Sequence, residues 1–135
     1  MTESDAQLKR LAERVGRHLL KARRRAATAE SCTGGWIAKA LTDIPGSSCW
    51  FSEGFVTYSN ESKVRRLGVP LTVLQRHGAV SEATVRAMAA GALRRSKAHV
   101  AVAVTGIAGP GGAVPGKPVG TVWLRSEERR VGKEC

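Results

Sequence analysis

Three side chains with polar or reactive atoms stand together at Ser31, Cys32 and Thr33, in the stretch "TAESCTGG" (28–35). A short apolar run precedes them and two glycines follow, which is typical of a tight corner between a strand and a helix. A serine at such a corner can present its hydroxyl to a ligand, although the GxSxG pattern of nucleophile elbows is absent. Taken alone, Ser31 is more often a helix cap, and Cys32 is more often a small buried hydrophobic residue.

Lys63 is the candidate base for Ser31. A serine nucleophile needs a group that accepts its proton, and the three histidines of the chain are scattered rather than gathered at a motif. An amine that is buried or close to other cations is partly neutral, and Lys63 in "TYSNESKVRR" is followed closely by two arginines. Tyr58, five residues earlier, could relay a proton or orient the lysine. The residues alone leave open that Lys63 is a solvated helix residue, because such sites are recognised by geometry.

Two glycine-rich loops follow apolar runs and could bind an anion. They are "ESCTGG" (30–35) and "TGIAGPGG" (105–112), the second directly after "VAVAV". In open α/β sheets, ligands bind beyond the carboxyl ends of the strands, and glycine lets main-chain N–H groups approach an anion closely. The start of the helix expected after Gly35 adds a partial positive charge. Neither loop fits GxxxxGK[ST] or GxGxxG, so no motif for ATP or a dinucleotide is present.

The elements expected around these loops alternate between helix and strand. Apolar periodicity, caps and glycine or proline stops predict helices over 5–22, 35–42, 60–67, 70–78 and 82–93. Short apolar or β-branched runs predict strands over 26–30, 48–59, 98–106 and 119–124, with 48–59 forming either one bent strand or two short ones. This alternation indicates a single α/β domain with a largely parallel sheet covered on both faces.

Composition and charge narrow the function classes. The chain has 135 residues and a net charge of +11, of which residues 1–28 contribute eight Lys/Arg against three acids. A nucleic-acid surface is one interpretation, but aromatic residues make up only 4% and no nucleic-acid-binding motif is present, so a solvated helix face is favoured. No apolar run approaches the roughly 18 residues of a membrane span, and the charged N-terminus lacks a signal peptide, so we expect a cytoplasmic protein.

Cysteine and histidine spacing favours free thiols and no metal site. The three cysteines, at positions 32, 49 and 135, form no CxxC pair, and no histidine lies at ligand spacing from them.

Four blocks of the sequence, in order, resemble the CinA C-terminal domain family, which includes nicotinamide-nucleotide amidohydrolases. They are "AESCTGGWIAKALTDIPGSS", "GFVTYSNESKVRRLGV", "GAVSEATVRAMAAGA" and "AVAVTGIAGPGG…KPVGTVW". The resemblance covers residues 8 to 123. It implies a three-layer α/β/α fold and hydrolysis of nicotinamide mononucleotide to nicotinate mononucleotide and ammonia. It implies no metal or organic cofactor.

The same resemblance assigns roles to particular residues. Ser31 would be the nucleophile, and Tyr58 and Lys63 would activate it. Thr105 and Gly106 would help to bind the oxyanion. The remaining residues would line the substrate pocket: Thr33, Gly34, Gly35, Ser59 and Asn60.

The resemblance also sets the expected domain boundary. Residues 1–124 would form the amidohydrolase-type domain, and residues 125–135, "RSEERRVGKEC", would be a polar tail that replaces a further strand and helix of the family. We therefore expect the fold to be truncated at this end. The alternative function is an accessory protein, linked to competence or DNA damage, that binds nucleic acid or a nucleotide without turnover. The expected partner is the small-molecule substrate, and a homo-oligomer is left open.

Overall fold

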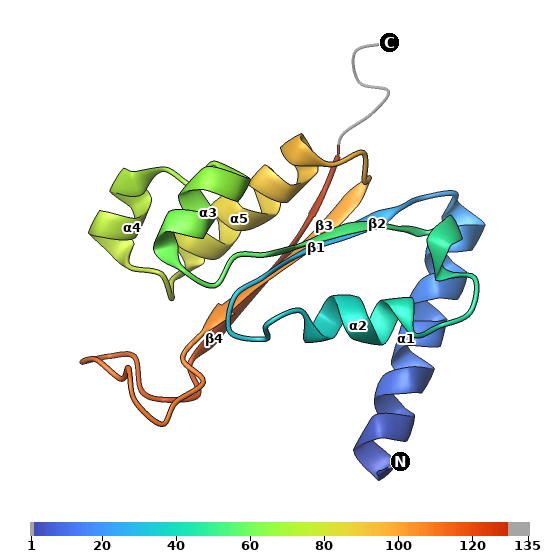
Figure 1. Cartoon of the computed structure of the whole chain (residues 1–135), viewed down its shortest axis with the longest axis horizontal. Helices are drawn as coiled ribbons and strands as arrows, with labels where there is room; N and C mark the ends of the chain where they lie inside the picture. The colour runs from blue at the N-terminus through green and yellow to red at the C-terminus, as the bar shows by residue number, and fades with distance from the viewer. Residues whose placement is uncertain (1, 130–135) are drawn as a thin grey trace.

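A four-stranded sheet in the order β2-β1-β3-β4 is the centre of the computed structural model, which describes residues 2–129 (Figure 1). The strands are β1 (Ala26–Glu30), β2 (Phe51–Val56), β3 (Val100–Gly106) and β4 (Val122–Glu128). β1 pairs in parallel with both β2 and β3, and β4 pairs antiparallel with β3. The carboxyl ends of β1, β2 and β3 therefore meet at one edge of the sheet.

Helices cover both faces of the sheet, which confirms the three-layer α/β/α prediction (Figure 1). α3, α4 and α5 lie on one side, and α2 lies on the other with α1 packed against it. The helices are α1 (Glu3–Ala22), α2 (Trp36–Thr42), α3 (Asn60–Leu67), α4 (Leu71–His77) and α5 (Glu82–Arg95). Among residues 2–129 no helix is both long enough and apolar enough to cross a membrane.

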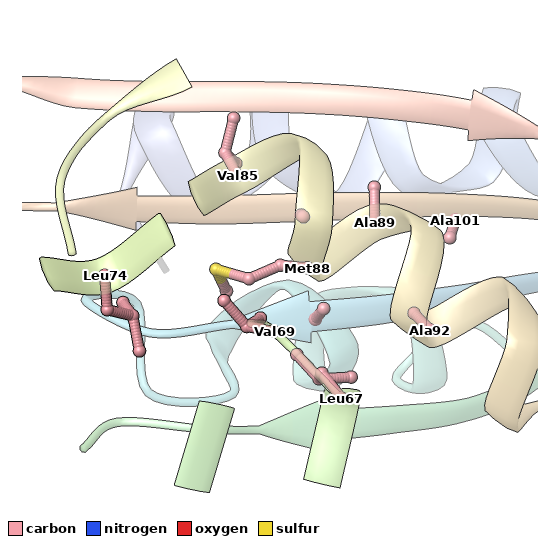
Figure 2. Packing of buried hydrophobic residues seen from close by; sticks show 10 residues of the cluster. Leu67, Val69, Leu74, Val85, Met88, Ala89, Ala92 and Ala101 are labelled. Carbon is pink, nitrogen blue, oxygen red and sulfur yellow. The ribbon is translucent and has the colours of Figure 1, made fainter. Parts of the chain in front are cut away.

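The core lies between the sheet and α5. Small residues of β1 and β3 let the helix approach the sheet closely, and larger side chains from α3, α4 and α5 fill the space beside them (Figure 2). The labelled members of this cluster are Leu67, Val69, Leu74, Val85, Met88, Ala89, Ala92 and Ala101. A second, smaller cluster of Ala12, Ile44 and Trp50 joins α1 to the segment after α2.

The pleat of β1 sends alternate side chains to opposite faces of the sheet. Ala29 belongs to the core cluster below α5. Thr28 points the other way, since its hydroxyl lies next to Gly54 of β2 on the side of Ala38 in α2. Glu30 shares the α2 side with Thr28, and the next residue, Ser31, turns back toward α3.

Two strands differ from the sequence prediction. The predicted strand over 48–59 is a 3-10 turn at Ser47–Cys49 followed by β2. β4 begins three residues later than predicted and continues to Glu128, because Val100 to Val104 of β3 offer antiparallel partners to residues 124–128. The strand thus crosses the boundary expected after residue 124, and the expected tail from residue 130 onward lies outside the described residues.

Gly91 is a position where α5 packs very closely against the end of α3. A Cβ atom at Gly91 would lie 1.9 Å from the carbonyl oxygen of Leu67. We expect Gly91→Ala to lower the free energy of unfolding by about 1–3 kcal/mol, the usual cost of overpacking a core. Urea unfolding measures this change. Gly111→Ala is the matched control, since no atom lies within 4 Å of its Cβ position, and equal stability of the two variants would contradict the close crossing.

Candidate active site

Main-chain hydrogen bonds fix Ser31 at the edge of the sheet where the three parallel strands end. The N–H of Ser31 donates to the carbonyl of Val104 at 3.0 Å, which continues the pairing of β1 with β3. On the other side, the carbonyl of Glu30 accepts from the N–H of Thr57 at 2.8 Å. The segment that leads from β2 into α3 therefore runs alongside Ser31.

Ser31 and Lys63 are in direct contact. Lys63 Nζ lies 3.0 Å from Ser31 Oγ and 2.9 Å from the carbonyl oxygen of Tyr58. Ser31 Oγ also lies 3.4 Å from that carbonyl oxygen. Ser31 is 6% exposed and Lys63 is 1% exposed. The structure thus brings together the two side chains that the sequence analysis paired as nucleophile and base.

The local sequence around Lys63 explains why its amine is buried. Ser59 caps α3 by accepting a hydrogen bond from the N–H of Ser62, and Gly68 ends the helix in the left-handed region. Between these caps, Lys63 and Leu67 occupy the buried face of α3. Leu67 enters the core, while Lys63 follows the same face toward the ends of the strands.

Burial lowers the pKa of the Lys63 amine from its ordinary value of 10.5. No carboxylate forms an ion pair with this amine within residues 2–129. Its hydrogen-bond partners are a neutral hydroxyl and a neutral carbonyl, so desolvation has the larger effect on its pKa, while the charge of the Cys32 thiolate acts in the opposite direction. A neutral amine at this position has a lone pair that can accept the proton of Ser31 Oγ.

Glu30 is the site residue that the sequence analysis missed. Its side chain is fully buried, and its carboxylate accepts hydrogen bonds from the hydroxyl of Thr33 at 2.6 Å and from three main-chain N–H groups. These belong to Gly35 at 3.2 Å, Ile37 at 3.0 Å and Ala38 at 2.9 Å. The available signal was an acidic residue at the end of an otherwise apolar strand and just before a helix start, where a carboxylate is stabilised by the helix dipole.

The N-terminal N–H groups of α2 are occupied by Glu30, which differs from the prediction that they would bind a ligand. The sequence analysis expected this helix terminus to suit a phosphate or an oxyanion. Its N–H groups instead donate to the carboxylate of Glu30, so the protein supplies the anion itself. The N–H of Gly34 is also used, since it donates to the carbonyl of Ser31 at 3.0 Å.

Cys32 lies between the Ser31 corner and the end of β3. Its sulfur is 3.0 Å from the position that a Cβ on Gly106 would take. Burial raises the pKa of the Cys32 thiol, whereas the N–H groups of Cys32 and Thr33 and the Lys63 amine act in the opposite direction. These two N–H groups have no carbonyl or carboxylate acceptor in the described part of the chain. They therefore differ from the N–H groups of Gly34 and Gly35, which donate to a carbonyl and a carboxylate of the protein.

The side chains of the other predicted site residues make no hydrogen bond to Ser31 Oγ or Lys63 Nζ in the described part of the chain. Tyr58 is 72% exposed, and its main-chain carbonyl, not its phenol, accepts hydrogen bonds from Lys63 and Ser31. The buried hydroxyl of Thr105 donates to the carbonyl of Ala79 at 2.8 Å. Ser59 is the cap of α3, and Asn60 is exposed beside it. Within residues 2–129, no three His, Cys, Asp or Glu side chains gather closely enough to hold a metal ion.

The lowered pKa of Lys63 predicts a pH-dependent stability. The folded protein binds this proton less tightly than the unfolded chain, so protonated Lys63 costs stability below its folded-state pKa. This cost disappears as the pH rises toward 10.5, the ordinary value. We expect Lys63→Met to be more stable than the wild type at low pH, with a difference that shrinks by at most about 1.4 kcal/mol per pH unit across this window.

Urea unfolding at a series of pH values measures the difference between Lys63→Met and the wild type. Lys97→Met, which removes an exposed lysine, is the matched control for the loss of one positive charge. A difference between Lys63→Met and wild type that is the same at every pH would contradict the burial of a weakly basic amine.

The chain matches the family model described as the CinA C-terminal domain over residues 8–133. It is 55% identical to the nicotinamide-nucleotide amidohydrolase PncC of Escherichia coli K12 over 121 residues, which are 90% of this chain and 73% of that protein. It is 64% identical to a CinA-like protein of Akkermansia muciniphila over 107 residues, which are 79% of this chain. It spans about a quarter, 26%, of that longer relative.

A solved structure agrees with these similarities. The competence/damage inducible protein CihA from Agrobacterium tumefaciens superposes with a TM-score of 0.88 at 52% identity, over 90% of this chain and 74% of that one. The family model covers nearly all of the chain, and the Escherichia coli relative is 55% identical over most of both proteins. The chain belongs to the CinA C-terminal domain family.

Proposed function

We propose that this chain hydrolyses the carboxamide of nicotinamide mononucleotide (NMN), giving nicotinate mononucleotide and ammonia. The observation that carries the proposal is the 3.0 Å contact between Ser31 Oγ and a buried lysine amine. Similarity supports the substrate, since relatives named nicotinamide-nucleotide amidohydrolase are 55% and 57% identical to the chain. The chain covers 73% and 71% of their lengths.

The proposed first step is acyl transfer to Ser31. Neutral Lys63 accepts the proton of Ser31 Oγ while the oxygen attacks the carboxamide carbon of the substrate. The C=O electron pair moves onto the amide oxygen, which becomes the oxyanion of a tetrahedral intermediate. When this intermediate collapses, Lys63 returns the proton to the amide nitrogen, the C–N bond breaks and ammonia leaves. The nicotinoyl group remains as an ester on Ser31.

The second step releases the acid. Water attacks the ester carbon while Lys63, again neutral, accepts one of its protons. The ester bond to Ser31 Oγ breaks, and the oxygen takes the proton back from Lys63. The carbonyl of Tyr58 supports both steps because it holds the amine beside Ser31 without adding a negative charge that would raise its pKa. The phenol of Tyr58, on a largely exposed residue, keeps its predicted role of relaying a proton or orienting the lysine.

Oxyanion binding is assigned to the corner after Ser31. The N–H groups of Cys32 and Thr33 are the candidates, because those of Gly34 and Gly35 already donate to Ser31 and Glu30. Losing one such donor typically costs about 3 kcal/mol of transition-state stabilisation. Thr105 and Gly106 stay predicted contributors to oxyanion binding. The predicted roles of Thr33, Ser59 and Asn60, with the two glycines, in lining the substrate pocket also stay predictions.

Ammonia release from NMN tests the function. We expect Ser31→Ala to lower kcat by about three orders of magnitude or more, as for the loss of a serine nucleophile elsewhere. Ser47→Ala is the matched control, because it removes another buried serine whose hydroxyl also bonds a carbonyl, that of Thr42. The control should keep wild-type activity. Equal ammonia release by the wild type and Ser31→Ala would refute the role of Ser31, and none from the wild type would refute the function.

The alternative from the sequence, an accessory protein that binds nucleic acid or a nucleotide without turnover, stays a prediction. It would show as NMN binding by calorimetry without ammonia release, or as DNA binding whose affinity falls steeply with salt. A homo-oligomer likewise stays a prediction.

The proposal includes a cytoplasmic location, which the free thiols of Cys32 and Cys49 support, since reduced cysteines persist in that compartment.

A further inference from the structure

Glu30 makes a dense set of contacts for a single side chain. Its carboxylate oxygen Oε1 accepts from the Thr33 hydroxyl and from the N–H groups of Gly35 and Ile37, while Oε2 accepts from the N–H of Ala38. All these donors belong to the segment from Thr33 to Ala38, which contains the turn after Ser31 and the first turn of α2. The side chain therefore ties the end of β1 to the chain that follows the nucleophile.

Glu30 is adjacent to Ser31 in sequence but lies on the other face of the sheet. Consecutive side chains of a strand point to opposite sides, and the two residues bind different helices, α2 for Glu30 and α3 for Ser31. The carboxylate of Glu30 is therefore not placed to accept the proton of Ser31. Any effect on the reaction must pass through the main chain that the two residues share.

We propose that Glu30 is a positioning residue, whose buried carboxylate holds Ser31 Oγ within reach of Lys63 Nζ. The inference rests on the proposed function and goes beyond it by assigning a role to a residue that does not contact the reacting atoms. Ser31 is held on one side by Val104 of β3 and is followed by a tight turn with glycine at φ +61° and +101°. The carboxylate of Glu30 binds the residues of this turn and of the helix start after it, so it fixes the chain that follows Ser31.

The contacts also explain why a carboxylate is needed. Every hydrogen bond to Glu30 is one that it accepts, and both oxygens take part. Glutamine keeps the shape but has one acceptor oxygen, so its NH₂ group must face at least one N–H donor. Alanine leaves all the donors without a partner in a buried place. The expected order of effect is Glu30→Ala larger than Glu30→Gln.

The test measures the reactivity of Ser31 for each folded molecule. We expect Glu30→Gln to lower kcat for NMN by about 10-fold to 100-fold with KM nearly unchanged, since misplacing a reacting group by about 1 Å costs up to about 100-fold. A fluorophosphonate probe, which reacts with activated serines, should label Ser31 more slowly by a similar factor. Urea unfolding of each variant gives the folded fraction by which both rates are divided.

Ile44→Val is the matched control for lost stability, because Ile44 lies in the second hydrophobic cluster, with Ala12 and Trp50. It should lower the unfolding midpoint and leave both rates unchanged. If Glu30→Gln lowers stability but leaves the labelling rate of folded molecules at the wild-type value, Glu30 is only structural and the proposal is overturned.

Thr33→Val removes one donor to the same carboxylate and extends the test if the Glu30 variants do not fold. Unchanged labelling of Thr33→Val would then overturn it.

The two readouts separate this inference from the proposed function. If the wild type releases no ammonia but its Ser31 is labelled, NMN hydrolysis fails while the ratio of labelling rates still decides the role of Glu30. If the wild type releases ammonia and Glu30→Gln matches it in both rates, the function stands and the positioning role fails. If Ser31 of the wild type is not labelled at all, there is no activated serine to position, and the inference fails with it.

Discussion

A lysine amine buried against a serine hydroxyl is the interaction on which the rest of this site depends. Lys63 Nζ has two neutral hydrogen-bond partners, Ser31 Oγ and the carbonyl of Tyr58, and no ion pair with any described carboxylate. Burial lowers the pKa of this amine and outweighs the opposing charge of the Cys32 thiolate, so it favours the neutral amine, which can act as a base. The surrounding fold has to maintain this arrangement, because a nearby carboxylate or open water would return the proton to the lysine.

Main-chain groups build most of the arrangement. The ends of three parallel strands bring the Ser31 corner and the start of α3 together through the bonds of Ser31 to Val104 and of Thr57 to Glu30. The pleat then separates the roles by face. Ser31 turns toward α3 and its lysine, whereas Glu30 turns toward α2 and occupies its free N–H groups. One strand end thus places the proposed nucleophile, Ser31, on one face of the sheet and the carboxylate of Glu30 on the other face, away from the proposed base, Lys63.

Residue types and spacing predicted much of this fold and part of the site. The alternation of helices and strands, the helix stop at Gly68, the helix cap at Ser81 and the pairing of Ser31 with Lys63 all follow from local pattern or from the family resemblance. The use of main-chain groups could not be predicted, because a sequence does not state which way a carbonyl points. Tyr58 was therefore assigned through its phenol, while its carbonyl makes the contacts. Glu30 was missed because its partners are main-chain N–H groups. The length of β4 depends on pairing with β3 rather than on its own polar residues.

The central claim is that the Lys63 amine is uncharged often enough at ordinary pH to take a proton from Ser31. The most direct measurement is a titration of the lysine side chains by ¹³C NMR at Cε, with the Lys63 signal assigned by its loss in a Lys63→Met variant. The account predicts that the Lys63 signal titrates at lower pH than those of the exposed lysines. A Lys63 signal that titrates together with the exposed lysines would contradict it.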